Sequence, residues 1–160
     1  MLRACEANAA AVRGTLLVLM IFIAVSAAAQ AGSNDDPDAH PPVSKADLKI
    51  VRRARQILRD PSKWNRADTR ECPAEANTFS LYCALEQATK DVTGSFQHRG
   101  AAMQEARFVI DDIAPNAKSY KHRLMDYNND PSTSFADIQK VFKLMERRMA
   151  EDLKKKGAAR

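Results

Sequence analysis

From residue 44 onward, apolar side chains recur at every third or fourth position, which is the spacing of an amphipathic helix. No stretch alternates polar and apolar residues for long enough to predict a strand. The pattern predicts helices over about 44–60, 77–93, 99–113, 117–127 and 135–155. We therefore expect an all-α fold, a small bundle of four to five helices in one domain.

Capping residues indicate where these helices begin and end. Ser44 with Asp47 three residues later, and Ser134 with Asp137, have the spacing of a capping box, in which the two side chains bond to each other's backbone amides. Gly94 follows the second helix at a position where a left-handed backbone is common. These residues predict the starts of the first and last helices and the end of the second.

The segment between the first two helices is irregular and polar, with one exception. Trp64 is the only tryptophan in the chain. We expect its ring to cap the core between the first two helices. The alternative is an exposed tryptophan that stacks on a ligand.

The first 31 residues have a different pattern. Arg3 and Arg13 come before an unbroken apolar run, Leu16 to Val25, and small residues follow it. This order is typical of a secretory signal peptide. The run is also shorter than the roughly 20 apolar residues that a membrane span needs, although an uncleaved anchor is the alternative.

Cleavage before Gly32, or two residues earlier, would divide the chain into four parts. The sequence predicts a signal peptide over 1–31, a flexible leader over 32–43, a helical domain over 44–156 and a disordered tail over 157–160. The mature protein would be periplasmic or secreted, with no stable membrane span after cleavage.

Export changes the interpretation of the cysteines. Cys72 and Cys83 are the two that follow the predicted cleavage site, and an exported protein meets conditions in which disulfides persist. The segment between them is long enough to fold back along the second helix. We expect a bridge, while the alternative is a buried Cys83 and an exposed Cys72 thiol.

The charge of the predicted mature chain is mild. Without residues 1–31 the chain keeps 23 basic and 19 acidic side chains, a net charge of +4, with both signs interspersed. Nucleic-acid binders usually concentrate their positive charge on one face or stripe, so no nucleic-acid partner is predicted. The end of the chain is the basic exception, and a solvated tail would explain it as well as a contact surface would.

The sequence from Asp126 to Asp137 places oxygen-bearing residues at several positions of a calcium-binding EF-hand loop. Pro131 occupies the position that requires a glycine, and its ring locks the backbone angle there. The same residues are accounted for by a turn between two helices, in which Asn128, Asn129 and Asp130 tolerate left-handed geometry. We therefore predict a turn and no metal site.

No catalytic motif, cofactor-binding motif or metal-ligand cluster is present in the sequence. We assign no catalytic residue and no cofactor. The leading hypothesis is a non-catalytic binding or interaction module of the cell envelope, whose partner is an envelope protein or an anionic surface polymer. Its predicted contact residues on the last helix are Lys143, Arg147, Arg148, Lys154, Lys155 and Lys156.

An enzyme is the alternative hypothesis. A hydrolase-like site would be assembled by the fold around His122 and Asp126, which lie four residues apart on one helix face, with His98 and Asp130 as further candidates. Self-association through the last helix is a third possibility, and the sequence does not predict the oligomeric state.

Three short features together resemble an uncharacterised family of small bacterial helical domains. They are Trp64, the Tyr82-Cys83-Ala84-Leu85 helix with Ala88, and the Tyr127-Asn128-Asn129-Asp130 turn before a capped helix. The resemblance covers about residues 49–149 and implies a helical fold. The signal peptide and the lack of a glycine near Leu85 depart from the family pattern. No activity follows from this resemblance.

Overall fold

The computed structural model describes residues 39–159, and the fold of this part is all-α, as the sequence predicted. Its only β-type pairing is an isolated bridge between Trp64 and Phe79. The predicted signal peptide and residues 32–38 of the leader lie outside the described residues. The helices are α1 Lys45–Ile57, α2 Leu81–Thr93, α3 Ala101–Ile113, α4 Arg123–Asn129 and α5 Phe135–Ala158, with 3-10 turns η1 Pro61–Lys63 and η2 Ala117–Ser119.

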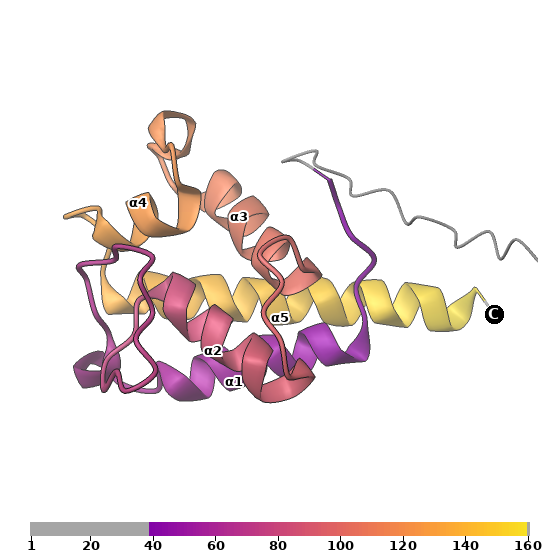
Figure 1. Cartoon of the computed structure of the whole chain (residues 1–160). Coiled ribbons are helices and arrows are strands. Elements are labelled where there is room, and N and C mark those ends of the chain that lie inside the picture. Colours follow the sequence, from indigo (N-terminus) through magenta and orange to yellow (C-terminus); the bar gives the residue numbers. More distant parts are fainter. Residues whose placement is uncertain (1–38, 160) are drawn as a thin grey trace, which may run out of the picture. The chain divides into compact units, whose positions relative to one another are not determined.

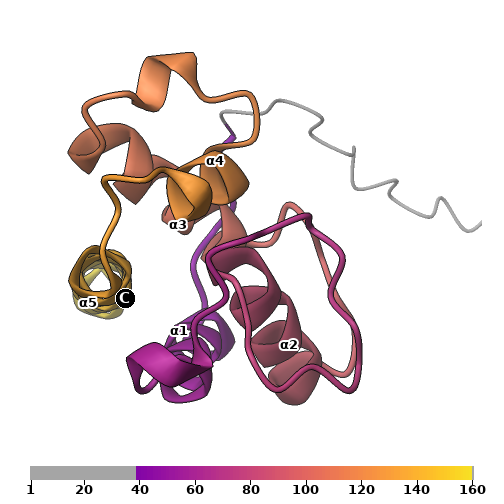
Figure 2. The ribbon, with the colours of Figure 1, turned by 90° about the vertical axis from the view of Figure 1, so that its left-hand side faces the viewer.

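The long α5 helix runs along one side of the described domain (Figure 1 and Figure 2). α1 packs against α2 and α5, while α3 packs against α5 and α4. The apolar stripes predicted from the sequence meet in one core, because each helix turns its buried face inward. The largest fully buried side chains include Leu58, Leu81, Leu85, Met103, Ile110, Ile138, Phe142 and Met145.

The predicted helix caps are confirmed. Ser44 with Asp47 and Ser134 with Asp137 both form complete capping boxes. Gly94 ends α2 in the left-handed conformation, with φ of 81°. α5 continues to Ala158, so its last residues belong to the helix and not to the predicted tail. Within residues 39–159, none of the helices combines the length and the hydropathy that crossing a bilayer requires.

The predicted start of the second helix at residue 77 or 78 is wrong. Ser80 is the N-cap, and its hydroxyl accepts a hydrogen bond from the Cys83 amide. The residue before it, Phe79, is held in an extended conformation because its amide donates to the Lys63 carbonyl at 2.8 Å. Backbone pairing with the preceding loop therefore delays the helix.

The predicted fourth helix is also different. Its first residues form the separate turn η2, and α4 begins only at Arg123. The Asp126 carboxylate accepts from the amides of Lys121 and His122 at 2.7 and 2.8 Å, which stabilises the first turn of α4.

The prediction of left-handed geometry at Asn128, Asn129 and Asp130 is wrong. α4 includes both asparagines, and among the described residues only Arg70 and Gly94 have positive φ. The corner before α5 therefore begins at Asp130, after α4 has ended.

The side chain of Asn128 lies at the centre of a buried hydrogen-bond network and has no exposed surface. Its Oδ1 accepts from the Trp64 indole N–H at 2.8 Å and from the Leu81 amide at 3.0 Å. Its Nδ2 donates to the Asn65 carbonyl at 3.0 Å. One amide therefore joins α4, the start of α2 and the loop between α1 and α2, which lie beside one another in Figure 2.

Trp64 packs against the core as predicted, but it also contacts elements that the sequence did not indicate. Its ring faces Phe135 of α5 at 6.1 Å and its N–H reaches α4. The tryptophan therefore closes the core where α4 and α5 meet, and not only between the first two helices. Its half-buried ring and the hydrogen bond that its N–H donates to Asn128 indicate a structural role.

The neighbouring asparagine extends this attachment of the loop. Asn129 Oδ1 accepts from the Asp68 amide at 2.7 Å, and its Nδ2 donates to the Asp68 carbonyl at 2.8 Å. Further along the loop, Cys72 and Cys83 form a disulfide that ties it to α2. Although the loop has an irregular backbone, it is held at several points along its length.

We predict that Asn128→Ala lowers the free energy of unfolding by about 3 kcal/mol, because two buried N–H donors and one carbonyl lose their partner. Urea denaturation of the purified protein measures this change. The matched control is Asn77→Ala, since Asn77 is exposed and its loss should cost less than about 0.5 kcal/mol. Equal effects of the two substitutions would contradict the role of Asn128.

We also predict that Cys72→Ser with Cys83→Ser lowers the free energy of unfolding by about 3 kcal/mol, since the bridge closes a short loop in the unfolded chain. The same denaturation experiment, with and without reductant, measures it. Reductant should destabilise the wild type and leave the double variant unchanged. A wild type that is insensitive to reductant would count against the bridge.

Candidate functional site

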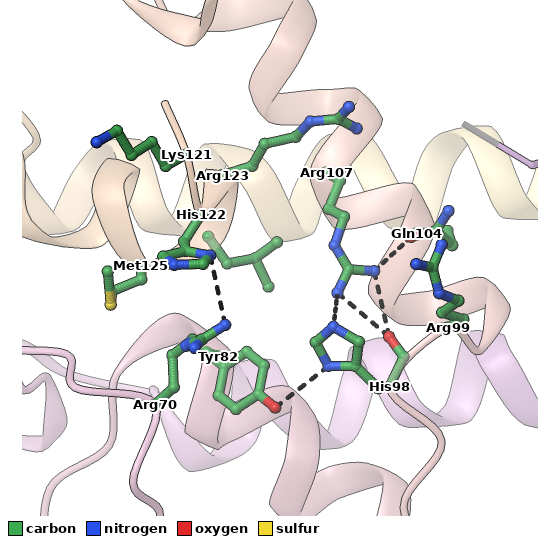
Figure 3. Close-up of a pocket in the computed structure, with 11 residues that line it drawn as sticks. Arg70, Tyr82, His98, Arg99, Gln104, Arg107, Lys121, His122, Arg123 and Met125 are labelled. Carbon is green, nitrogen blue, oxygen red and sulfur yellow. Dashed lines mark hydrogen bonds between the residues drawn. The ribbon is translucent and has the colours of Figure 1, made fainter. Parts of the chain in front are cut away.

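A cavity of about 190 Å³ is lined by five side chains of arginine and lysine (Figure 3). Its walls come from the loop before α2, from α2, from the loop before α3, from α3 and from the segment that leads into α4. None of the described residues that line it is acidic. The lining residues are Arg70, Tyr82, His98, Arg99, Gln104, Arg107, Lys121, His122, Arg123, Leu124 and Met125.

Arg107 is the most constrained of these cations. Its guanidinium donates to the His98 carbonyl at 3.2 Å and also to Gln104 Oε1. A further contact of 3.1 Å joins Nη2 to His98 Nε2. On the other side of the ring, His98 Nδ1 lies 3.3 Å from the Tyr82 hydroxyl. The three side chains form one chain of contacts (Figure 3).

The chemistry of arginine determines the proton positions along this chain. A guanidinium has donors only, so His98 Nε2 must accept from Arg107. The neutral ring then carries its proton on Nδ1 and donates it to the Tyr82 oxygen. Tyr82 keeps its own O–H proton, and no acceptor for it lies among the described residues. The cavity therefore gains a hydroxyl donor.

Arg70 enters the cavity from the loop and has an unusual backbone. Its φ is 62°, in the left-handed region that side chains other than glycine rarely adopt. The Asp68 carboxylate supports this conformation, since it accepts from the Arg70 amide at 2.7 Å. The Arg70 guanidinium lies 3.4 Å from His122 Nδ1 (Figure 3). A strained backbone at a cavity is typical of functional sites.

Four of the five cations of the cavity have no carboxylate partner among residues 39–159. Arg123 is the exception, because it pairs with Asp111 at 3.1 Å. Elsewhere in the domain, arginines such as Arg53 and Arg148 form ion pairs of 2.6 and 2.7 Å. The cations without an acidic partner are Arg70, Arg99, Arg107 and Lys121.

Burial, more than the crowding of like charge, shifts the pKa values of the groups in the cavity. Burial, followed by repulsion from Arg123, lowers the pKa of Arg107 to about 10, so this side chain stays charged at neutral pH. Burial and the nearby Arg107 lower the pKa of His98, which keeps its ring neutral. Burial also raises the pKa of Tyr82, so its hydroxyl remains a donor.

This arrangement can bind an anion. Guanidinium, ammonium and hydroxyl groups supply donors and positive charge, and no neighbouring acid of the lining competes for them. The cavity is smaller than the roughly 300 Å³ of an ordinary small-molecule site, which suits a small anionic group. In the described part of the chain, no three His, Cys, Asp or Glu side chains are grouped closely enough to hold a metal ion.

The six α5 residues predicted to bind a partner do not line this cavity. Arg148 is held by Asp112 at 2.7 Å and lies 3.7 Å from Glu105. Lys156 donates to the Val43 carbonyl at 3.2 Å. Lys143, Arg147, Lys154 and Lys155 are exposed, so their role as contact residues stays a prediction.

The candidate residues of the enzyme hypothesis are only partly brought together. His98 and His122 line the same cavity, but Asp126 and Asp130 do not. The Asp126 carboxylate bonds to two backbone amides at the start of α4. The Asp130 carboxylate bonds to Ser132 and to the Tyr120 hydroxyl. Neither acid forms a pair with a histidine.

The sequence did not predict that these cationic side chains line one cavity, because they come from several separate segments. The nearest signal is the spacing of His98, Arg99 and Arg107 around the start of one helix. No sequence pattern indicated a role for Arg70, since its position depends on the folded loop.

Within residues 39–159, fold and cavity together define a small all-α domain with a Cys72–Cys83 disulfide and a cavity lined by basic side chains. The chain belongs to the family described as "Family of unknown function (DUF6197)", which matches residues 42–148. This confirms the expected membership of an uncharacterised family over nearly the predicted range. No curated protein and no solved structure matches the chain.

We predict that His98 makes the domain less stable as the pH falls below about 6.5. Its pKa is lowered in the folded protein, so the unfolded chain binds the proton more readily and acid favours unfolding. Melting temperatures between about pH 7 and pH 5 measure this effect. The drop should be smaller for His98→Gln than for the wild type, and parallel curves would contradict the prediction.

Proposed function

We propose that this chain is an exported, non-catalytic binding domain that receives an anionic group of a cell-envelope component in the basic cavity. The single observation that carries the proposal is that Arg70, Arg99, Arg107 and Lys121 line one cavity without an acidic partner among the described residues. Maintaining like charges side by side costs free energy, and a bound anion would offset that cost.

Two observations support the proposal of export. The sequence begins with the features of a secretory signal peptide. The Cys72–Cys83 disulfide suits the periplasm or the extracellular space, where such bridges persist. Both are compatible with a periplasmic or secreted protein that meets its partner outside the cytoplasm.

A binding role fits the cavity better than a hydrolase does. A general base needs an unprotonated nitrogen within reach of the substrate. In His98 and His122 one ring nitrogen of each already lies against an arginine, at 3.1 and 3.4 Å. Asp126 is held by backbone amides and cannot orient His122 as a catalytic pair would need.

The basic residues of α5 have a secondary place in the proposal. Lys154, Lys155 and Lys156 lie on the exposed last turns of the helix. They would attract an envelope protein or an anionic surface polymer through long-range charge, which salt screens. The cavity would then hold one anionic group of that partner.

A retention experiment tests the proposal on columns of polyglutamate, dextran sulfate and polyphosphate. We predict that the wild type is retained on at least one of them and that Arg70→Gln with Arg107→Gln weakens binding about a hundredfold, since each lost charged interaction costs about 1.5 kcal/mol or more.

The control variant carries Lys154→Gln, Lys155→Gln and Lys156→Gln. It should lose part of its salt-dependent retention and keep the contribution of the cavity. The proposal fails if no column retains the wild type at low salt. It also fails if the double arginine variant is retained as strongly as the wild type.

A further inference from the structure

We infer that the group bound in the cavity is a phosphate-type dianion, either inorganic phosphate or the terminal phosphate of a monoester. This inference rests on the proposed anion-binding function and names its ligand class. A carboxylate and a phosphodiester are the two alternatives that the geometry disfavours. Three properties of the cavity lead to this conclusion: the directions of its donors, its charge and its size.

The donors of the cavity come from several sides. Arg70 projects from the loop and Tyr82 from α2 (Figure 3), while Arg107 on α3 adds positive charge, because its terminal nitrogens already donate to His98 and Gln104. A carboxylate has two oxygens in one plane and is satisfied by a single guanidinium fork. A tetrahedral phosphate presents oxygens in several directions, so it can accept from Arg70 and Tyr82 together while it lies close to the charge of Arg107.

The charge of the cavity favours a dianion over a monoanion. Five cations line it, and Asp111 accounts for one of them through its pair with Arg123. A carboxylate or a phosphodiester brings one negative charge, whereas a phosphate monoester brings about two at neutral pH. A dianion therefore relieves more of the repulsion among these cations.

The neutral state of His98 adds selectivity through Tyr82. Because His98 accepts from Arg107 and donates to the Tyr82 oxygen, the Tyr82 O–H is directed to another acceptor. A dianionic oxygen is the strongest acceptor that could meet it. The small volume of about 190 Å³ admits a terminal phosphate more readily than a diester that must continue on both sides.

The test is isothermal titration calorimetry with the purified chain at constant low ionic strength. The ligands are inorganic phosphate, methyl phosphate, dimethyl phosphate and acetate. We predict that inorganic phosphate, methyl phosphate or both bind at about pH 7.5, and that dimethyl phosphate and acetate bind about tenfold more weakly or not at all. Binding of methyl phosphate points to the end of a larger molecule, and binding of inorganic phosphate alone points to the free ion.

A pH series separates ligand charge from protein charge. Methyl phosphate loses its second charge near about pH 6, so its affinity should fall about tenfold between pH 7.5 and pH 5. Sulfate keeps two charges over this range and reports on titration within the protein. The titratable and charged groups that line the cavity are Arg70, Tyr82, His98, Arg99, Arg107, Lys121, His122 and Arg123, and of these residue types histidine is the one that ordinarily changes charge over such a range. Methyl phosphate should lose more affinity than sulfate does.

Variants connect the binding to the cavity. Arg70→Gln and Arg107→Gln should each weaken phosphate binding about tenfold, and Tyr82→Phe should weaken it by a smaller factor without lowering the melting temperature. Arg147→Gln is the matched control, because Arg147 is exposed on α5 and does not line the cavity. Its affinity should equal that of the wild type. If Arg107→Gln unfolds, Arg70→Gln and Tyr82→Phe still test the site.

The outcomes distinguish the inference from the proposed function. Acetate or dimethyl phosphate that binds as tightly as methyl phosphate overturns the inference but leaves an anion-binding cavity. Phosphate affinity that Arg70→Gln, Arg107→Gln and Tyr82→Phe all leave unchanged also overturns it. If no anion binds and no polymer column retains the chain, the inference and the proposed function both fail.

Discussion

The buried amide of Asn128 is the interaction on which the rest of the described domain depends. The loop between α1 and α2 has few apolar residues of its own, so burial alone cannot hold it. Asn128 provides an acceptor for Trp64 and Leu81 and a donor for Asn65, and these bonds fix the loop against α4 and the start of α2. Because each group would be costly to bury without a partner, the arrangement is specific as well as stable.

The position of the cavity follows from this attachment. Asn129 holds the backbone of Asp68 on both its N–H and its carbonyl, and Asp68 in turn supports the left-handed backbone of Arg70. Two residues later, Cys72 is joined to Cys83, the neighbour of Tyr82. Arg70 is thus fixed from both sides at the edge of a cavity whose other cations come from α3 and the loop before it, and from the start of α4 and the segment that leads into it. The contacts that hold the loop in place therefore also position Arg70 at the proposed anion site.

The sequence allowed the helical fold, both capping boxes and the family membership to be predicted, because these depend on local spacing. It did not predict the start of α2 at Leu81, since Phe79 is held extended by a loop distant in sequence. It assigned Asn128 to a turn, although the side chain lies in a helix and serves the core. The cavity could not be predicted because it also depends on distant parts of the chain. Arg70 and Arg107 are 37 positions apart and line the same cavity only after the loop has docked.

The central claim is that cations gathered by the docked loop form a site for one anion. A crystal structure of the purified chain soaked in tungstate, a tetrahedral dianion with a strong anomalous signal, tests it most directly. We expect an ordered anomalous peak in the cavity, within hydrogen-bonding distance of Arg70 or Tyr82. A peak found only along the basic turns of α5, or no ordered peak in a cavity open to solvent, would contradict it.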